Sequence, residues 1–148
     1  EAGRPHKIGG AKMNVLVVEP GFLPYEKEIN GLDEMQKTVG GLIQAIYPFQ
    51  EEVALVCNEN GIFEHLEFNR MIPEREYGGI FGTFFICGLG EENFISLTPK
   101  QVKTYTARFK KAEVPLVVNG GRPIIAKIDA IPKSPPDRPK HPRKPPGR

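Results

Sequence analysis

The sequence has few of the residues from which metal centres are built. It holds two cysteines and three histidines, and it has no tryptophan. Only one of the histidines, His65, lies outside the unpatterned ends of the chain. One histidine with two cysteines cannot complete a four-ligand zinc site. We therefore expect no metal and no cofactor.

Motifs for covalent or phosphate chemistry are also missing. A Cys–His pair could combine His65 with Cys57 or Cys87, but both cysteines lie inside apolar runs, where reduced core thiols are the commoner outcome. A disulfide would require them to face each other on neighbouring strands. The Gly88-Leu89-Gly90 turn lacks the third glycine of a dinucleotide fingerprint, and there is no Walker-type loop. We expect a protein that is not an enzyme, with an enzyme of unrecognised type as an alternative.

Long apolar segments are absent as well. No run approaches the roughly 20 residues of a membrane span. The N-terminus carries no apolar segment of the secretory kind. These features predict a cytoplasmic protein without a membrane partner.

Charge is present but unevenly distributed. The formal net charge is +2. Residues 13–111 contain 9 Lys/Arg against 14 Asp/Glu, a net charge of −5, whereas the flanks contain 11 against 4, a net charge of +7. An acidic body argues against a phosphate-binding surface on the domain itself.

This contrast divides the chain. We expect residues 1–12 to be a disordered leader or an expression-derived addition, and residues 13–111 to form one domain. Residues 112–131 could add a hairpin about Asn119-Gly120. Residues 132–148 contain seven prolines and six Lys/Arg, which predicts a disordered basic tail.

The central element of the domain is predicted at Thr83 to Cys87, a charge-free β-rich run between glycines. Further strands are expected at 14–18 and 25–29, and residues 53–57 and 62–66 are expected to form a hairpin. A short helix should follow Asn30-Gly31 and end at Gly40-Gly41. The fold class is α+β, a mostly antiparallel sheet of about five or six strands with two helices packed on it.

The clearest local signal is the start of the second helix, predicted over 98–111. Thr98 is placed as N-cap, Pro99 as first helical residue and Gln101 as the capping-box partner. Five Lys/Arg make the exposed part of this helix basic. The helix and the tail together suggest a weak association with nucleic acid.

The most informative polar pair is Asn69-Arg70. Arg70 is one of four basic residues between Glu19 and Glu92, where fourteen residues are acidic. Such an arginine either forms a structural ion pair or presents its fork to an anionic ligand. Both readings remain open at this point.

The residues also resemble a bacterial and phage domain-of-unknown-function family, number 3846, over residues 13–109. The resemblance rests on Val17-Val-Glu-Pro-Gly21, Pro24-Tyr25, Val39-Gly-Gly41, Tyr47-Pro48, Val56-Cys-Asn-Glu59 with Gly61, Asn69-Arg70, and Gly82-Thr-Phe-Phe-Ile-Cys-Gly88 with Phe94 and Ser96-Leu97. It implies a cytoplasmic protein of bacteria, their phages or mobile elements, and it supplies no activity.

We therefore predict a small non-catalytic binding or accessory protein of a mobile element or phage. Its partner would be a protein or a small anionic ligand, held by Asn69 and Arg70 together with Asn58 and Tyr25. The alternatives are a nucleic-acid-associated protein and the unrecognised enzyme.

Overall fold

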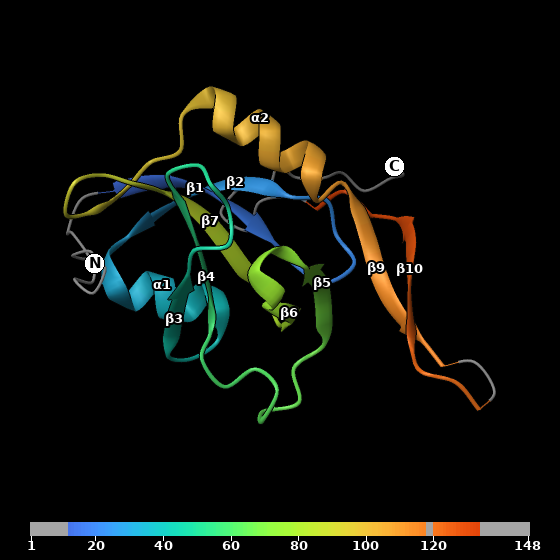
Figure 1. Cartoon of the computed structure of the whole chain (residues 1–148). Coiled ribbons are helices and arrows are strands. Elements are labelled where there is room, and N and C mark those ends of the chain that lie inside the picture. Colours follow the sequence, from blue (N-terminus) through green and yellow to red (C-terminus); the bar gives the residue numbers. More distant parts are fainter. Residues whose placement is uncertain (1–11, 118–119, 134–148) are drawn as a thin grey trace, which may run out of the picture.

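The computed structural model describes residues 12–117 and 120–133 (Figure 1). The predictions for the leader up to residue 11 and for the tail from residue 134 lie outside the described residues. The main sheet is antiparallel, with strand order β2-β1-β7-β4-β3 and β8 paired to β7. Its strands are β1 (Lys12–Val18), β2 (Tyr25–Asn30), β3 (Ile43–Ile46), β4 (Val53–Asn58), β7 (Phe84–Leu89) and β8 (Phe94–Ile95).

The middle of the sheet is β7, and the predicted central strand is confirmed. Its residues from Phe84 to Gly88 are buried. Phe84 and Ile86 enter one hydrophobic core, and Phe85 and Cys87 enter the other. This division follows from the period-two alternation of side chains along a strand.

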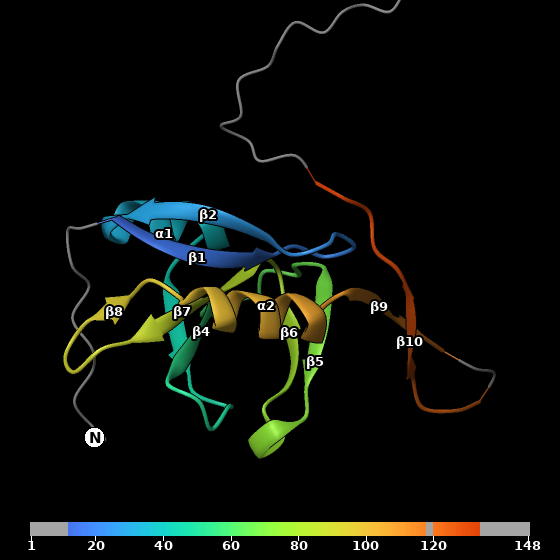
Figure 2. The ribbon, with the colours of Figure 1, turned by 90° about the horizontal axis from the view of Figure 1, so that it is seen from above.

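Each core is closed by a different layer, and the two helices lie on opposite sides of the sheet (Figures 1 and 2). Helix α1 (Gly31–Val39) buries Met35 and Val39 on one face. Helix α2 (Pro99–Arg108) and a hairpin of β5 (Phe68–Ile72) and β6 (Gly78–Phe81) cover the other face. The predicted α+β architecture is confirmed.

Both helices begin and end close to where the sequence places them. Thr98 and Gln101 form the complete capping box, and Gly40 ends α1 at φ 83° in the left-handed region. The second helix is shorter than the predicted 98–111. It ends at Arg108, because Lys111 already begins the strand β9 (Lys111–Leu116).

The predicted hairpin of 53–57 with 62–66 is wrong. Both edges of β4 are occupied, by β3 and by β7. Residues 62–66 instead curl into turns, in which the Leu66 N–H donates to Gly61 O at 3.0 Å. The connection expected between Leu66 and Gly79 in fact contains β5, a 3₁₀ turn (Glu74–Glu76) and the start of β6.

After α2 the chain forms an additional hairpin, and Asn119 of the turn expected at Asn119-Gly120 lies outside the described residues. Strand β9 pairs antiparallel with β10 (Ile124–Asp129). The hairpin starts beside β5 and extends away from the sheet (Figure 2). Within residues 12–117 and 120–133, no helix has both the length and the apolar character needed to cross a bilayer.

Candidate functional site

The Asn69-Arg70 pair lies on β5 and is turned into the protein. Both side chains have 0% exposure. Arg70 Nη1 donates to Asn69 Oδ1 at 2.8 Å, and Nη2 donates to the carbonyl oxygens of Phe22 at 3.0 Å and Phe109 at 2.8 Å. The guanidinium therefore joins β5 to the β1–β2 loop and to the end of α2.

Asn69 extends the same network toward the sheet. Its Nδ2 donates to the carbonyl oxygens of Val18 and Gly82, each at 2.9 Å. Burial lowers the pKa of Arg70, and the nearby carboxylate of Glu113 opposes that shift. These contacts support a structural role for Arg70. Its hydrogen-bond partners are carbonyl and amide oxygens, however, and not the carboxylate of the expected ion pair. The ligand role expected for this pair gains no support from its burial.

The other two candidates lie elsewhere. Tyr25 is on the edge strand β2, where its hydroxyl donates to Glu19 Oε2 at 2.5 Å. Asn58 ends β4, donates from Nδ2 to Val39 O at 3.2 Å and accepts from the Asn60 N–H at 2.7 Å. The four predicted residues therefore do not form one site.

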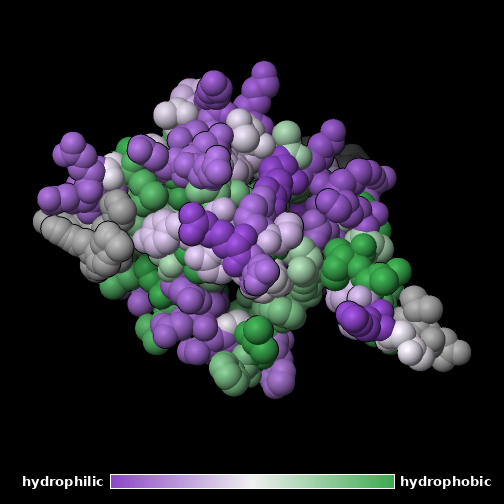
Figure 3. All heavy atoms as spheres, viewed as in Figure 1, coloured by the Kyte–Doolittle hydropathy of each residue, from purple (hydrophilic) through white to green (hydrophobic). Residues whose placement is uncertain are grey.

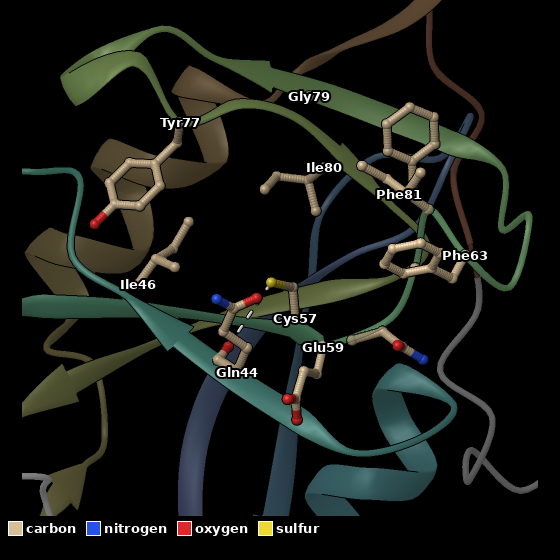
Figure 4. A pocket seen from close by; sticks show the side chains of 12 residues that line it. Gln44, Ile46, Cys57, Glu59, Phe63, Tyr77, Gly79, Ile80 and Phe81 are labelled. Atoms are coloured by element: carbon tan, nitrogen blue, oxygen red, sulfur yellow. Dashed lines mark hydrogen bonds between the residues drawn. The ribbon is translucent and has the colours of Figure 1, made fainter.

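Of the four, Asn58 lines a cavity of about 240 Å³ between the β3–β4 end of the sheet and the β5–β6 hairpin (Figure 4). Gln44, Ile46 and Cys57 form its sheet side. The opposite side is formed by Gly79, Ile80 and Phe81 of β6. Small-molecule sites measure roughly 300–1,000 Å³, so this cavity suits a single large side chain.

Aromatic and acidic residues frame the cavity. Phe63 is 83% exposed and comes from the turn after β4, while Tyr77 approaches from just before β6 (Figure 4). Glu59 is the acidic residue of the lining. The surroundings therefore combine apolar surface with one negative charge.

The cysteine in the cavity is a poor nucleophile. Burial raises the pKa of Cys57 to about 11, and its Sγ donates to Gln44 O at 3.7 Å. Burial likewise raises the pKa of Cys87 to about 12. Both thiols are free, and they point into opposite cores, which excludes a disulfide between them in this fold. His65 lies exposed in the neighbouring turn.

The cavity lies beside an open edge of the sheet. Leu42 O accepts the Glu59 N–H at 2.8 Å. Because antiparallel bonding alternates along a strand, Ile43 and Ala45 then direct their backbone N–H and C=O groups away from β4. In the part of the chain that the structure describes, no strand pairs with that side of β3.

The two edges of the sheet differ in character. Edge strand β2 carries Glu26, Lys27 and Glu28 among its six residues. Charges of this kind protect an edge from pairing with another chain. Strand β3, Ile-Gln-Ala-Ile, has none. The sequence shows this contrast, but only the strand order makes β3 an edge.

A second hollow, of about 620 Å³, lies between α2 and the 3₁₀ turn. In it Arg108 makes a bidentate pair with Glu74, at 2.6 and 2.8 Å, and lies over the rings of Phe49 and Phe109. The Tyr105 hydroxyl donates to Glu51. The arginine of the basic helix is thus already held by a carboxylate, and Lys111 pairs with Asp129.

The Arg108–Glu74 pair predicts a specific pH dependence. The hydrogen bond from Arg108 lowers the pKa of Glu74 in the folded state. A lowered carboxyl pKa stabilises the fold above the unfolded-state pKa, and this contribution is lost as pH falls through the folded-state pKa. Glu74→Gln should therefore reduce stability near neutral pH, by less than about 1 kcal/mol, because the two side chains are still 30% and 34% exposed to solvent. The deficit should vanish in acid, as measured by urea unfolding at several pH values. A deficit that persists unchanged below pH ~3 would contradict the assignment.

Comparison with known proteins adds a family and no activity. Neither the curated proteins nor the solved structures contain a match to this chain. A family model described as a domain of unknown function, DUF3846, matches residues 13–110. That span runs from β1 through α2 and leaves the whole β9–β10 hairpin outside. By this match over about two-thirds of its length, the chain belongs to the DUF3846 family.

Proposed function

We propose that this chain is a non-catalytic binding protein that takes an extended peptide at the open edge of β3. The observation that carries the proposal is the uncharged edge strand beside a cavity of one-side-chain size. An added strand gains backbone hydrogen bonds from the edge and sequence selectivity from pockets for alternate side chains.

The geometry specifies the peptide. Gln44 and Ile46 of β3 belong to the cavity side of the sheet, and side chains of a strand added to β3 alternate in the same way. One large apolar side chain of the peptide would therefore enter between Tyr77 and Ile46. Glu59 and the net charge of −5 on residues 13–111 favour a basic residue next to it.

The absence of catalysis is part of the proposal. It is supported by the raised pKa of Cys57, which leaves the thiol protonated near neutral pH. In the described ranges, 12–117 and 120–133, no three His, Cys, Asp or Glu residues come together as a metal site.

Selection from a random peptide library displayed on phage tests the proposal. We expect binders with an apolar residue next to Lys or Arg. Ala45→Pro should abolish their binding, because proline removes an outward N–H that β4 does not use. Tyr77→Ala should weaken binding by about tenfold or more, roughly 1.4 kcal/mol.

Matched controls make the result specific. Ile95→Ala, on β8 away from the cavity, removes an apolar side chain of similar exposure, 44% against 41% for Tyr77, and should leave binding unchanged. Glu59→Lys should reverse the preference for basic peptides. Peptides that bind Ala45→Pro as well as the unaltered chain would defeat the proposal.

We also propose that the protein has an accessory role in the bacterial cytoplasm and belongs to a phage or mobile element. The identity of the neighbouring genes tests this proposal. Nucleic-acid association has less support, because ion pairs occupy two of the five cations predicted on the basic helix. Real phosphate contacts would make affinity fall steeply with salt. Nucleic-acid binding that is absent, or that does not change with salt concentration, would rule out that alternative.

A further inference from the structure

The tip of the β5–β6 hairpin has a strained backbone. Residues 73–77, the tip turn, join the two strands. Arg75 and Glu76 adopt φ angles of 54° and 59°, in the left-handed region that few residues other than glycine, asparagine and aspartate enter. Strain of this kind collects at ligand clamps and switch regions, where the surrounding structure holds it in place. The tip turn is therefore a candidate for an element with two positions.

The tip turn lies over the cavity beside β3. Tyr77, its last residue, lines the cavity together with Gly79 and Ile80 of β6, and Cys57 lies on the opposite wall (Figure 4). Cys57 is only 5% exposed. A displacement of the turn would therefore open a path from solvent to the Cys57 thiol.

One ion pair joins the tip turn to the body of the protein. Glu74 accepts two hydrogen bonds from the Arg108 guanidinium of α2, at 2.6 and 2.8 Å. The guanidinium is itself held over the rings of Phe49 and Phe109. Within residues 12–117 and 120–133, no other ion pair involves the tip turn. The position of the turn relative to α2 thus depends on this pair.

Burial does little to hold the tip turn. Four of its five residues are exposed. Figure 3 shows hydrophilic side chains over α2 and over the centre of the same view, where Figure 1 places the turn. The strands behind it are fixed, because Ile72 and Ile80 are buried in the core beneath α2. Movement would therefore be confined to the turn.

We propose that the tip turn is a lid over the cavity, and that the Glu74–Arg108 ion pair holds this lid closed. Opening admits the apolar side chain of a bound peptide, and in this respect the inference rests on the proposed peptide-binding function. The lid itself does not, since it concerns only access to the cavity. A partly exposed ion pair stabilises weakly, so the loss of this pair should shift the balance toward the open lid by a small factor.

The alkylation rate of Cys57 by N-ethylmaleimide measures the opening of the lid. Cys87 has 0% exposure in the other core, so its alkylation reports global unfolding. In the unaltered chain Cys57 should react at least about tenfold faster than Cys87. Its rate should also depend less on urea concentration, because a local opening exposes less surface than unfolding does. Mass spectrometry of proteolytic fragments distinguishes the two thiols.

Removal of the ion pair should accelerate the reaction of Cys57. Glu74→Gln should raise its rate about two- to fivefold, the effect of one partly exposed pair. Glu19→Gln is the matched control and should leave that rate unchanged. Glu19 lies in the β1–β2 loop and pairs with Lys133 at 2.7 Å, and the side chains of both pairs are between 20% and 34% exposed.

Two substitutions of Arg75 test the contribution of the strained backbone, and both remove the same charge. Valine is β-branched and poorly suited to a left-handed φ, so Arg75→Val should raise the Cys57 rate at least about threefold. Asparagine tolerates that conformation, so Arg75→Asn should not raise it.

Equal rates and equal urea dependence for Cys57 and Cys87 in the unaltered chain would overturn the proposal, because global unfolding would then expose both thiols. A Cys57 rate that Glu74→Gln leaves unchanged, or that Glu19→Gln raises as much, would also overturn it, as would equal rates in the two Arg75 variants. These measurements need no peptide. If no library peptide binds, the peptide-binding role fails, while the Cys57 rates still decide whether the tip turn is a lid.

Discussion

Replacement of Arg70 by alanine is expected to remove about 3–5 kcal/mol from the free energy of unfolding. The change leaves the carbonyl oxygens of Phe22 and Phe109 and the Asn69 Oδ1 without their donor in the interior. Each buried acceptor left unpaired costs about 1–3 kcal/mol. Domains of this size are stable by only about 5–15 kcal/mol, so the variant should lie near its folding threshold. Equilibrium unfolding in urea measures the loss.

Two further variants separate the causes of that loss. Arg70→Lys keeps the charge but lacks the planar fork that reaches three oxygens, so it should retain most of the defect. Lys103→Ala removes an exposed cation from α2 and should change stability by less than about 0.5 kcal/mol. A loss below about 1 kcal/mol for Arg70→Ala would show that water or other donors replace the guanidinium.

Replacement of Phe84 by alanine is expected to cost about 3–5 kcal/mol through the cavity it leaves. Phe84 has 0% exposure and meets the ring of Phe109 edge-on, with centroids 5.3 Å apart. The substitution therefore loosens the contact between the central strand and the end of α2. Thermal and urea unfolding both report the effect.

Phe63→Ala is the matched control, because that phenylalanine is 83% exposed and should contribute little. Hydrogen exchange adds a local measure. The amides of Phe84 to Ile86 should exchange only through global unfolding in the unaltered chain, and much faster in Phe84→Ala. Rapid exchange there in the unaltered chain would contradict the sandwiched position of β7.

Elements set by near neighbours in the chain could be predicted from the sequence. The start of α2 depends on Thr98, Pro99 and Gln101, all within one helical turn. The burial of β7 follows from a charge-free run, which can be stable only when both faces are covered. The first helix likewise ends at a glycine that accepts the left-handed conformation.

The candidate site was less predictable. Asn69 and Arg70 stand out in the sequence, yet their partners lie 39 to 51 positions away or in a neighbouring loop. The neighbouring residues in the sequence do not distinguish an arginine that binds a ligand from one that donates hydrogen bonds to buried carbonyl groups. Phe63 and Tyr77 were missed, because an exposed aromatic residue gains meaning only beside a cavity. The turn signal at Asn58 to Gly61 correctly marked the place but suggested the wrong strand partner.

The sequence by itself determined the class of fold, both helix starts and stops to within a few residues, the buried central strand and the separation of an acidic body from basic flanks. Each of these depends on residues close together in the chain or on composition. Tertiary structure alone decided which strands pair, that β3 is an open edge, that Arg70 acts inside the protein and that Leu116, Ile124 and Ile128 of the final hairpin are exposed. Those outcomes depend on contacts between distant segments, whose free energies are compared only when the whole chain packs.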